Sequence, residues 1–142
     1  MARPPSPPDA SPALALVVLA RIVGRSVDEA LAGAGTSVRE VGVLGHLSAA
    51  PGLTITELAR RSGVTVQSMH ALVADLVARD LVDRGAEPGR GRAAELTVTT
   101  GGRRLLARAR RALAPVDRRL FADPALDVPA ALGVRLGPPA PE

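Results

Sequence analysis

The chain has 142 residues and a net charge of +4, enough length for one domain with its own hydrophobic core. It has no cysteine, which excludes disulfide bonds and thiol redox sensing, and two histidines without cysteine make no credible zinc site. We expect no metal, no cofactor and no enzymatic activity, because none of the common catalytic motifs is present.

Both ends of the chain are rich in proline, and we expect residues 1–12 and 137–142 to be disordered tails. Charged residues interrupt the apolar run after position 13 before it reaches membrane-spanning length. No targeting segment is recognisable either. We therefore expect a cytoplasmic protein with no membrane partner.

A long helix is predicted over residues 13 to about 32. Two apolar stripes follow it at three- and four-residue spacing, formed by Leu16, Leu19, Val23, Val27 and Ala30 and by Leu14, Val18 and Ile22. A helix that is apolar on two sides must be covered on two sides. We favour a second subunit as the second cover, and a central position within the fold is the alternative.

Ser37 and Glu40 have the S-x-x-E spacing of a capping box, which predicts the start of a second helix. Its inner face is expected to carry apolar residues at every third position, namely Val38, Val41, Leu44 and Leu47. His46 lies on the same helix, and we expect it to be half-buried. The sequence AAPGL ends this helix.

The stretch that follows has the pattern of a helix-turn-helix. Thr54 and Glu57 form another capping box, Gly63 suits a left-handed turn, and Thr65 can cap the next helix. The inner faces of the two helices are expected to consist of Ile55, Leu58 and Ala59 on the first and Met69, Leu72, Val73 and Leu76 on the second.

A β-hairpin is predicted next. One strand begins at Leu81 and Val82, residues 95–99 alternate as the returning strand, and the glycine-rich residues 85–94 form the loop between them. These features predict a mainly α protein with a small β-hairpin wing. We expect the chain to form a winged helix-turn-helix with dimerisation helices at both ends.

A second long helix should start at Thr99 or Thr100 and run to about residue 113, with a break or kink at Pro115. Short helical pieces, broken at Pro124 and Pro129, are expected up to residue 136. All 18 basic residues are arginines, and residues 79–111 hold nine of them with four acids, a net +5. A localised positive charge suggests a polyanionic partner. A GC-rich genome and a solvated helix face are the alternative explanations.

The order of elements over residues 13–121 resembles the MarR family of bacterial regulators. The resemblance rests on ELARRSGVTVQSMHALVADLVARDLVDR and the later LTVTTGG. It implies a homodimer on a pseudo-palindromic operator and a small anionic effector between the dimer and DNA-binding parts. The DNA-binding part would be residues 37–99 and the dimerisation part residues 13–34 and 100–136.

The chain departs from the family pattern in three places. One is the C-terminal helix region, which is short and broken by prolines, so that a shorter dimer interface is expected. Arg90-Gly91-Arg92 stands where the family wing commonly carries Asp-x-Arg, and Ala71 stands where a larger basic or polar residue is common. The acid–arginine pairing that usually braces the family wing is therefore not implied for this chain, and the wing tip gains charge.

The expected DNA contacts lie on the second helix of the motif, at the end of the first, and on the wing. Gln67 suits adenine, Thr65 and Ser68 suit phosphates or base edges, and Ala71 suits a thymine methyl. The remaining candidates are His70 on the second helix, Arg60, Arg61 and Arg84 as phosphate contacts, and Arg90 and Arg92 for the minor groove.

The favoured function is a sequence-specific repressor that binds double-stranded DNA. One alternative is a winged-helix module for protein interaction, which the two alanines at positions 71 and 74 favour. Another is a sequence-tolerant, chromatin-like DNA binder, which the arginine-rich wing favours.

Overall fold

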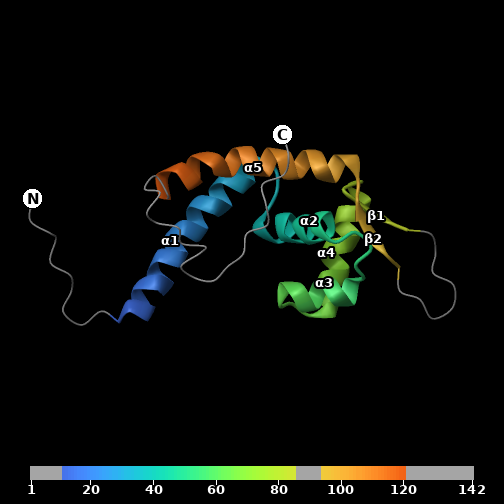
Figure 1. Cartoon of the computed structure of the whole chain (residues 1–142), viewed down its shortest axis with the longest axis horizontal. Coiled ribbons are helices and arrows are strands. Elements are labelled where there is room, and N and C mark those ends of the chain that lie inside the picture. Colours follow the sequence, from blue (N-terminus) through green and yellow to red (C-terminus); the bar gives the residue numbers. More distant parts are fainter. Residues whose placement is uncertain (1–10, 86–93, 121–142) are drawn as a thin grey trace, which may run out of the picture.

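The computed structural model describes residues 11–85 and 94–120, which form five helices and two strands (Figure 1). In chain order these are α1 (Pro12–Gly33), α2 (Val38–Ala49), α3 (Ile55–Ser62), α4 (Val66–Ala78), β1 (Val82–Arg84), β2 (Leu96–Val98) and α5 (Thr100–Leu120). The predicted class, mainly helical with a small antiparallel hairpin, is confirmed.

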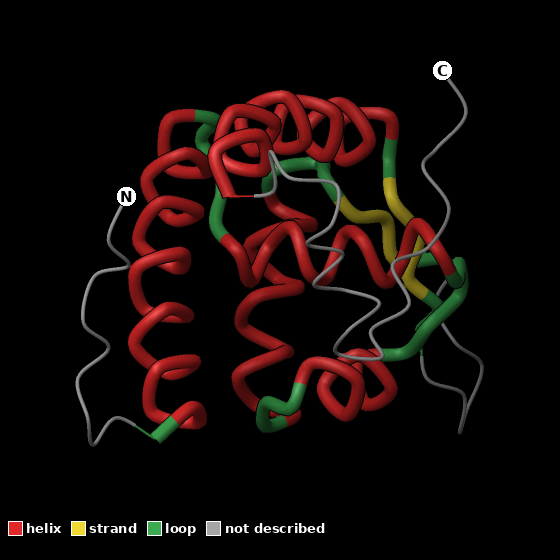
Figure 2. The backbone as a smooth tube through the Cα atoms, turned by 60° about the vertical axis from the view of Figure 1, so that its left-hand side comes forward, coloured by secondary structure: helices red, strands yellow, loops and turns green. Residues whose placement is uncertain are grey.

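The helices are arranged around α2. In Figures 1 and 2, α5 runs along one edge of the molecule, α3 lies at the opposite edge, and α2 lies between them. α1 packs against α5, and α4 joins the α3 side to the hairpin. The helix-turn-helix pair and the outer surface of α5 therefore lie on opposite sides of the molecule.

Both predicted capping boxes are present and begin α2 and α3. At the start of α2 the Glu40 backbone N–H donates to Ser37 Oγ over 3.3 Å, and the Ser37 backbone N–H donates to Glu40 Oε2 over 3.2 Å. Thr54 and Glu57 repeat the arrangement at α3, with a 2.7 Å bond from the Thr54 backbone N–H. These bonds satisfy backbone donors that the first turn of a helix leaves free.

The core lies between α2, α3, α4, the hairpin and α5. Its members are all aliphatic or methionine and are listed here in chain order: Val43, Leu44, Leu47, Leu53, Leu58, Ala59, Met69, Val73, Leu76, Val82, Leu96, Leu105 and Leu106. One expected core residue of α2 is misplaced. Val38 is 50% exposed and Val43 is buried instead, because the helical period of 3.6 moves a strict three-residue repeat off the buried face.

The hairpin is short, and the loop before α3 adds a further backbone contact to it. Val82 pairs with Val98 and Arg84 with Leu96 in antiparallel register. Leu53, in the loop before α3, adds a bridge to Leu96, and the Leu96 backbone N–H donates to the Leu53 carbonyl over 3.1 Å. The base of the wing is therefore tied to the helix-turn-helix. The arginines expected at its tip, Arg90 and Arg92, lie outside the described residues.

The two glycines that start α5 allow it to approach the α4–β1 turn closely. A Cβ atom on Gly102 would lie 2.2 Å from the Leu81 carbonyl oxygen and 2.6 Å from Val98 Cγ1. A Cβ atom on Gly101 would lie 2.9 Å from the Asp80 carbonyl oxygen. Glycine is thus required here by packing, and the sequence VTTGG marks the joint between wing and helix.

Of the two outcomes predicted at Pro115, a break or a kink, the break is wrong. α5 continues through Pro115 to Leu120, and Val116, one residue after the proline, is buried. The proline ring is exposed, so the helix tolerates it where no neighbour is displaced. The helical pieces expected after Leu120, including Phe121, lie outside the described residues.

Candidate nucleic-acid interface

The turn between α3 and α4 presents the start of α4 to solvent. Gly63 adopts a left-handed conformation with φ of 65° and ends α3. Thr65 then caps α4, because its Oγ1 accepts a 3.1 Å bond from the Ser68 backbone N–H. Both local predictions are confirmed. The capped N-terminus of α4 therefore lies at the edge of the molecule, where the positive end of the helix dipole faces solvent.

The inner and outer faces of α4 divide as the spacing predicted. Met69, Val73 and Leu76 are buried, and Leu72 is half-buried. The outer face is exposed throughout and consists of Val66, Gln67, Ser68, His70, Ala71 and Ala74. A surface that mixes short polar groups with small apolar ones can contact base edges in a DNA groove without a steric barrier.

The two hydroxyl groups at the start of α4 are already bonded to each other. Thr65 Oγ1 donates to Ser68 Oγ over 2.9 Å while it accepts from the Ser68 backbone N–H. The Ser68 hydroxyl proton remains available to an acceptor such as a phosphate oxygen. Ser68 is therefore the better placed of the two predicted contacts, and Thr65 acts first as a helix cap.

The described arginines near this face are exposed. Arg60 and Arg61 lie in the last turn of α3, and Arg84 lies at the end of β1. The charges of Arg60 and Arg61 also act on Glu57. Bonds from the Thr54 backbone N–H and hydroxyl lower the pKa of Glu57, and the two arginines lower this pKa further.

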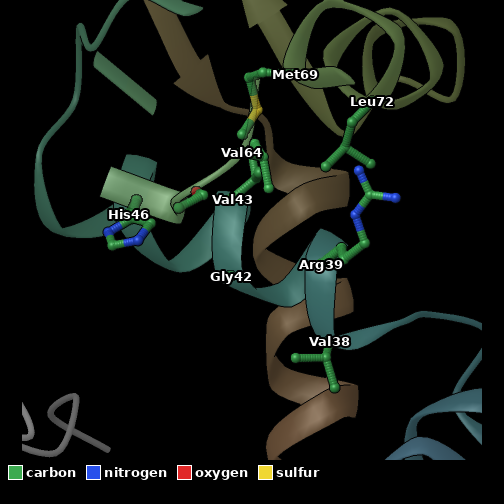
Figure 3. Close-up of a pocket in the computed structure, with 9 residues that line it drawn as sticks. Val38, Arg39, Gly42, Val43, His46, Val64, Met69 and Leu72 are labelled. Carbon is green, nitrogen blue, oxygen red and sulfur yellow. The ribbon is translucent and has the colours of Figure 1, made fainter. Parts of the chain in front are cut away.

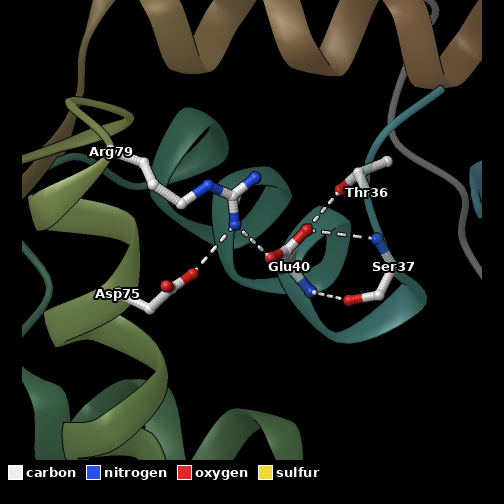
Figure 4. Close-up of polar contacts among 5 residues, drawn as sticks. All are labelled: Thr36, Ser37, Glu40, Asp75 and Arg79. Carbon is white, nitrogen blue, oxygen red and sulfur yellow. Dashed lines mark hydrogen bonds and ion pairs between the residues drawn. The ribbon is translucent and has the colours of Figure 1, made fainter.

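Arg79 is not a free surface charge, because it belongs to an ion-pair network. Its guanidinium contacts Glu40 on α2 at 2.5 Å and Asp75 on α4 at 2.9 Å (Figure 4). The pair with Asp75 is an i,i+4 pair that the sequence could have shown. The pair with Glu40 spans 39 positions, and no local pattern indicates it.

A pocket of about 240 Å³ lies between α2, the α3–α4 turn and α4 (Figure 3). Most of its lining is apolar and includes Val43, Val64 and Met69. Two side chains of α2, Arg39 and His46, add polar groups to it. His46 is half-buried, as expected. This pocket lies wholly within the DNA-binding part, whereas the effector site that the family resemblance implies lies between that part and the dimerisation part. The sequence did not indicate the pocket, because its walls come from three separate elements.

Among residues 11–85 and 94–120, no three His, Asp or Glu side chains gather where they could hold a metal ion. Within the same residues, no helix combines the length and apolar character that a bilayer crossing requires.

Comparison with known proteins adds three findings. A family model described as the MarR family matches residues 34–93. The HTH-type transcriptional repressor Rv2887 of Mycobacterium tuberculosis is 36% identical over 96 residues, which cover 68% of this chain and 69% of that protein.

Two crystal structures of Rv2887 have a similar fold. The complex with DNA has a TM-score of 0.69 at 31% identity and covers 80% of this chain and 85% of that one. The complex with salicylic acid has a TM-score of 0.64 at 32% identity and covers 89% of this chain and 92% of that one.

Proposed function

This chain belongs to the MarR family of transcriptional regulators, and we propose that it represses transcription as a homodimer on a pseudo-palindromic operator. One observation carries the proposal. Every residue on the outer face of α4, the second helix of the helix-turn-helix, is exposed, as a helix that enters the major groove requires. A similar chain, Rv2887, has been solved in complex with DNA.

The N-terminal half of α1 supports the homodimer. Its large aliphatic residues lie around most of the helix circumference and are between 49% and 58% exposed, namely Leu14, Leu16, Val17, Val18, Leu19 and Ile22. So much apolar surface on one helix is rarely left in water by a monomer. A second copy of α1 can cover it, and two-fold symmetry would place two α4 helices on two half-sites.

We assign the contacts as follows. Gln67 binds an adenine edge and Ala71 contacts a thymine methyl, while Ser68 and Thr65 contact phosphates or base edges. His70 is the remaining contact on α4. Arg60, Arg61 and Arg84 bind phosphates. On the evidence of the sequence alone, Arg90 and Arg92 bind the minor groove.

The test uses duplexes selected by the wild-type protein from a random library. Wild type should prefer the selected duplex over random DNA by at least ~10³. Gln67→Ala should relax the preference at one base pair by about 1–3 kcal/mol and leave the salt dependence unchanged. Arg61→Gln should weaken binding to all sequences alike and reduce the salt slope by about one.

The outcomes separate this function from its alternatives. Tight binding without a sequence preference would indicate a chromatin-like binder. The absence of salt-dependent DNA binding would indicate a protein-interaction module. In light scattering at micromolar concentration, the dimer should have twice the 14.5 kDa mass of the chain.

The pocket of Figure 3 favours control by a small anion. Arg39 supplies a positive charge, His46 a hydrogen-bonding group, and the walls are apolar, which together suit an organic acid. Rv2887 has been solved with salicylic acid. Salicylate should raise the melting temperature of wild type and release the duplex, and Arg39→Gln should reduce both effects. Stabilisation without DNA release would contradict an effector role.

A further inference from the structure

One carboxylate joins three parts of the chain. Glu40 Oε2 accepts bonds from the Ser37 backbone N–H at 3.2 Å and from Thr36 Oγ1 at 2.8 Å (Figure 4). Both donors belong to the loop between α1 and α2. Its other oxygen, Oε1, accepts from Arg79 at the C-terminal end of α4. The loop after α1, the start of α2 and the end of α4 therefore meet at Glu40.

The side chains of Glu40 and Arg79 differ in how tightly they are held. The Glu40 side chain is 13% exposed and fixed by three donors, whereas Arg79 is 38% exposed and contacts two carboxylates. Asp75 and Arg79 are both near the end of α4, so their pair cannot orient that helix relative to anything else. Among the hydrogen bonds and ion pairs of residues 11–85 and 94–120, the contact with Glu40 is the one that connects the end of α4 to the loop that follows α1.

This connection lies far from the DNA-facing end of α4. The helix has 13 residues, so its two ends are about 20 Å apart. A tilt of about 10° at the Arg79 end would move the Gln67 end by about 3.4 Å, which is the rise of one base pair. In a dimer joined through α1, the tilt of α4 thus determines how far apart two half-sites must be.

We propose that the Glu40–Arg79 pair is a positioning contact that fixes the tilt of α4 relative to α1 and so determines the half-site spacing that the dimer accepts. This inference rests on the proposed function, because it needs a dimer that binds two half-sites. The Glu40–Arg79 pair does not contact DNA in this proposal. Both side chains act through the orientation of α4.

The test measures spacing preference and not affinity alone. Duplexes selected by the wild-type protein from a random library are shortened or lengthened by one base pair between the half-sites. Glu40→Gln is the main variant, because glutamine still serves the capping box while the charge opposite Arg79 is lost. Arg79→Gln removes the other partner, and Asp75→Asn is the matched control that breaks only the local pair.

Wild type should bind the altered spacings much more weakly than the selected one. In Glu40→Gln and Arg79→Gln this preference should fall about fivefold. A partly exposed ion pair changes an equilibrium constant by up to about that factor. The double variant should show no further loss, because both changes remove the same contact. Asp75→Asn should keep the wild-type preference, and Arg79→Lys should restore most of it.

A preference that stays at the wild-type level in both single variants would overturn the inference, and a lower melting temperature in the same variants would then assign the pair a purely structural role. A wild-type protein without any spacing or sequence preference would instead refute the proposed function, and the inference with it. Circular dichroism confirms that each variant is folded.

Discussion

Gly102 occupies a position where the fold has no room for a side chain. A Cβ atom there would lie 2.2 Å from a backbone oxygen, which cannot move without displacing the α4–β1 turn. We expect Gly102→Ala to lower the free energy of unfolding by about 3 kcal/mol, the upper end of what overpacking costs. Urea denaturation of the purified variant measures the change.

Gly45 is the matched control for this substitution. It lies inside α2, is exposed, and a Cβ atom would meet nothing within 4 Å. Gly45→Ala should therefore stabilise the protein by about 0.5–1 kcal/mol, because alanine is the better helix former. Equal effects at the two positions would show that close packing at the start of α5 is not the cause.

Glu57 should make stability depend on pH in the acidic range. Its pKa is lowered in the folded state, mainly by the bond from the Thr54 backbone N–H. The stabilisation is therefore complete above the ordinary pKa that Glu57 has in the unfolded chain and is lost as the pH falls through its lower folded pKa. Glu57→Gln should be less stable than wild type at pH 7, and the difference should shrink toward pH 3. Urea midpoints at both pH values measure it, and a difference independent of pH would exclude the charge as its cause.

At the scale of elements, α5 carries a proline that it does not need. Pro115 lies inside the helix, where it lacks an N–H donor and leaves the Arg111 carbonyl without its helical partner. Pro115→Ala should raise the free energy of unfolding by about 1–3 kcal/mol. Thermal denaturation measures the gain, and Pro51→Ala, in an exposed turn, should give none. A loss of stability in Pro115→Ala would mean that the proline shapes a bend that the fold uses.

The elements and their ends follow from local chemistry, and for that reason the sequence could predict them. The capping pairs, the left-handed Gly63 and the exposed face of α4 depend only on neighbours in the chain. The Glu40–Arg79 pair, the pocket beside His46 and the close approach at Gly102 depend on segments far apart in sequence. The helix does not break at Pro115, because the proline ring is exposed and the next residue, Val116, is buried in the fold.

At the scale of the whole molecule, the positive charge of residues 79–111 is divided between different surfaces. Arg79 is paired with carboxylates, and Arg84 lies at the base of the wing. On α5, Arg104, Arg108 and Arg111 are exposed at helical spacing on the face opposite the buried residues. In Figure 1, α2 lies between α5 and α3. The sequence alone had grouped these arginines as one region.

The arginines of α5 should therefore contribute little to operator binding. Changing Arg104, Arg108 and Arg111 together to glutamine should leave the affinity for the selected duplex within about twofold and the salt slope unchanged. Changing Arg60 and Arg61 together should reduce that slope by about two, near 0.9 for each phosphate contact. Affinities at two salt concentrations measure both slopes. A reduced slope in the α5 variant would place DNA on that side of the molecule.

The exposed aliphatic residues of the N-terminal half of α1 would link repression to the abundance of the protein itself. Below the dissociation constant of the proposed dimer, the amount of dimer rises with the square of the chain concentration, by mass action. Doubling the rate of synthesis would then quadruple the form that can hold both half-sites. A promoter under such control switches over a narrower range of expression than one controlled by a monomer, and trimming Leu19 to alanine would move that threshold to higher expression.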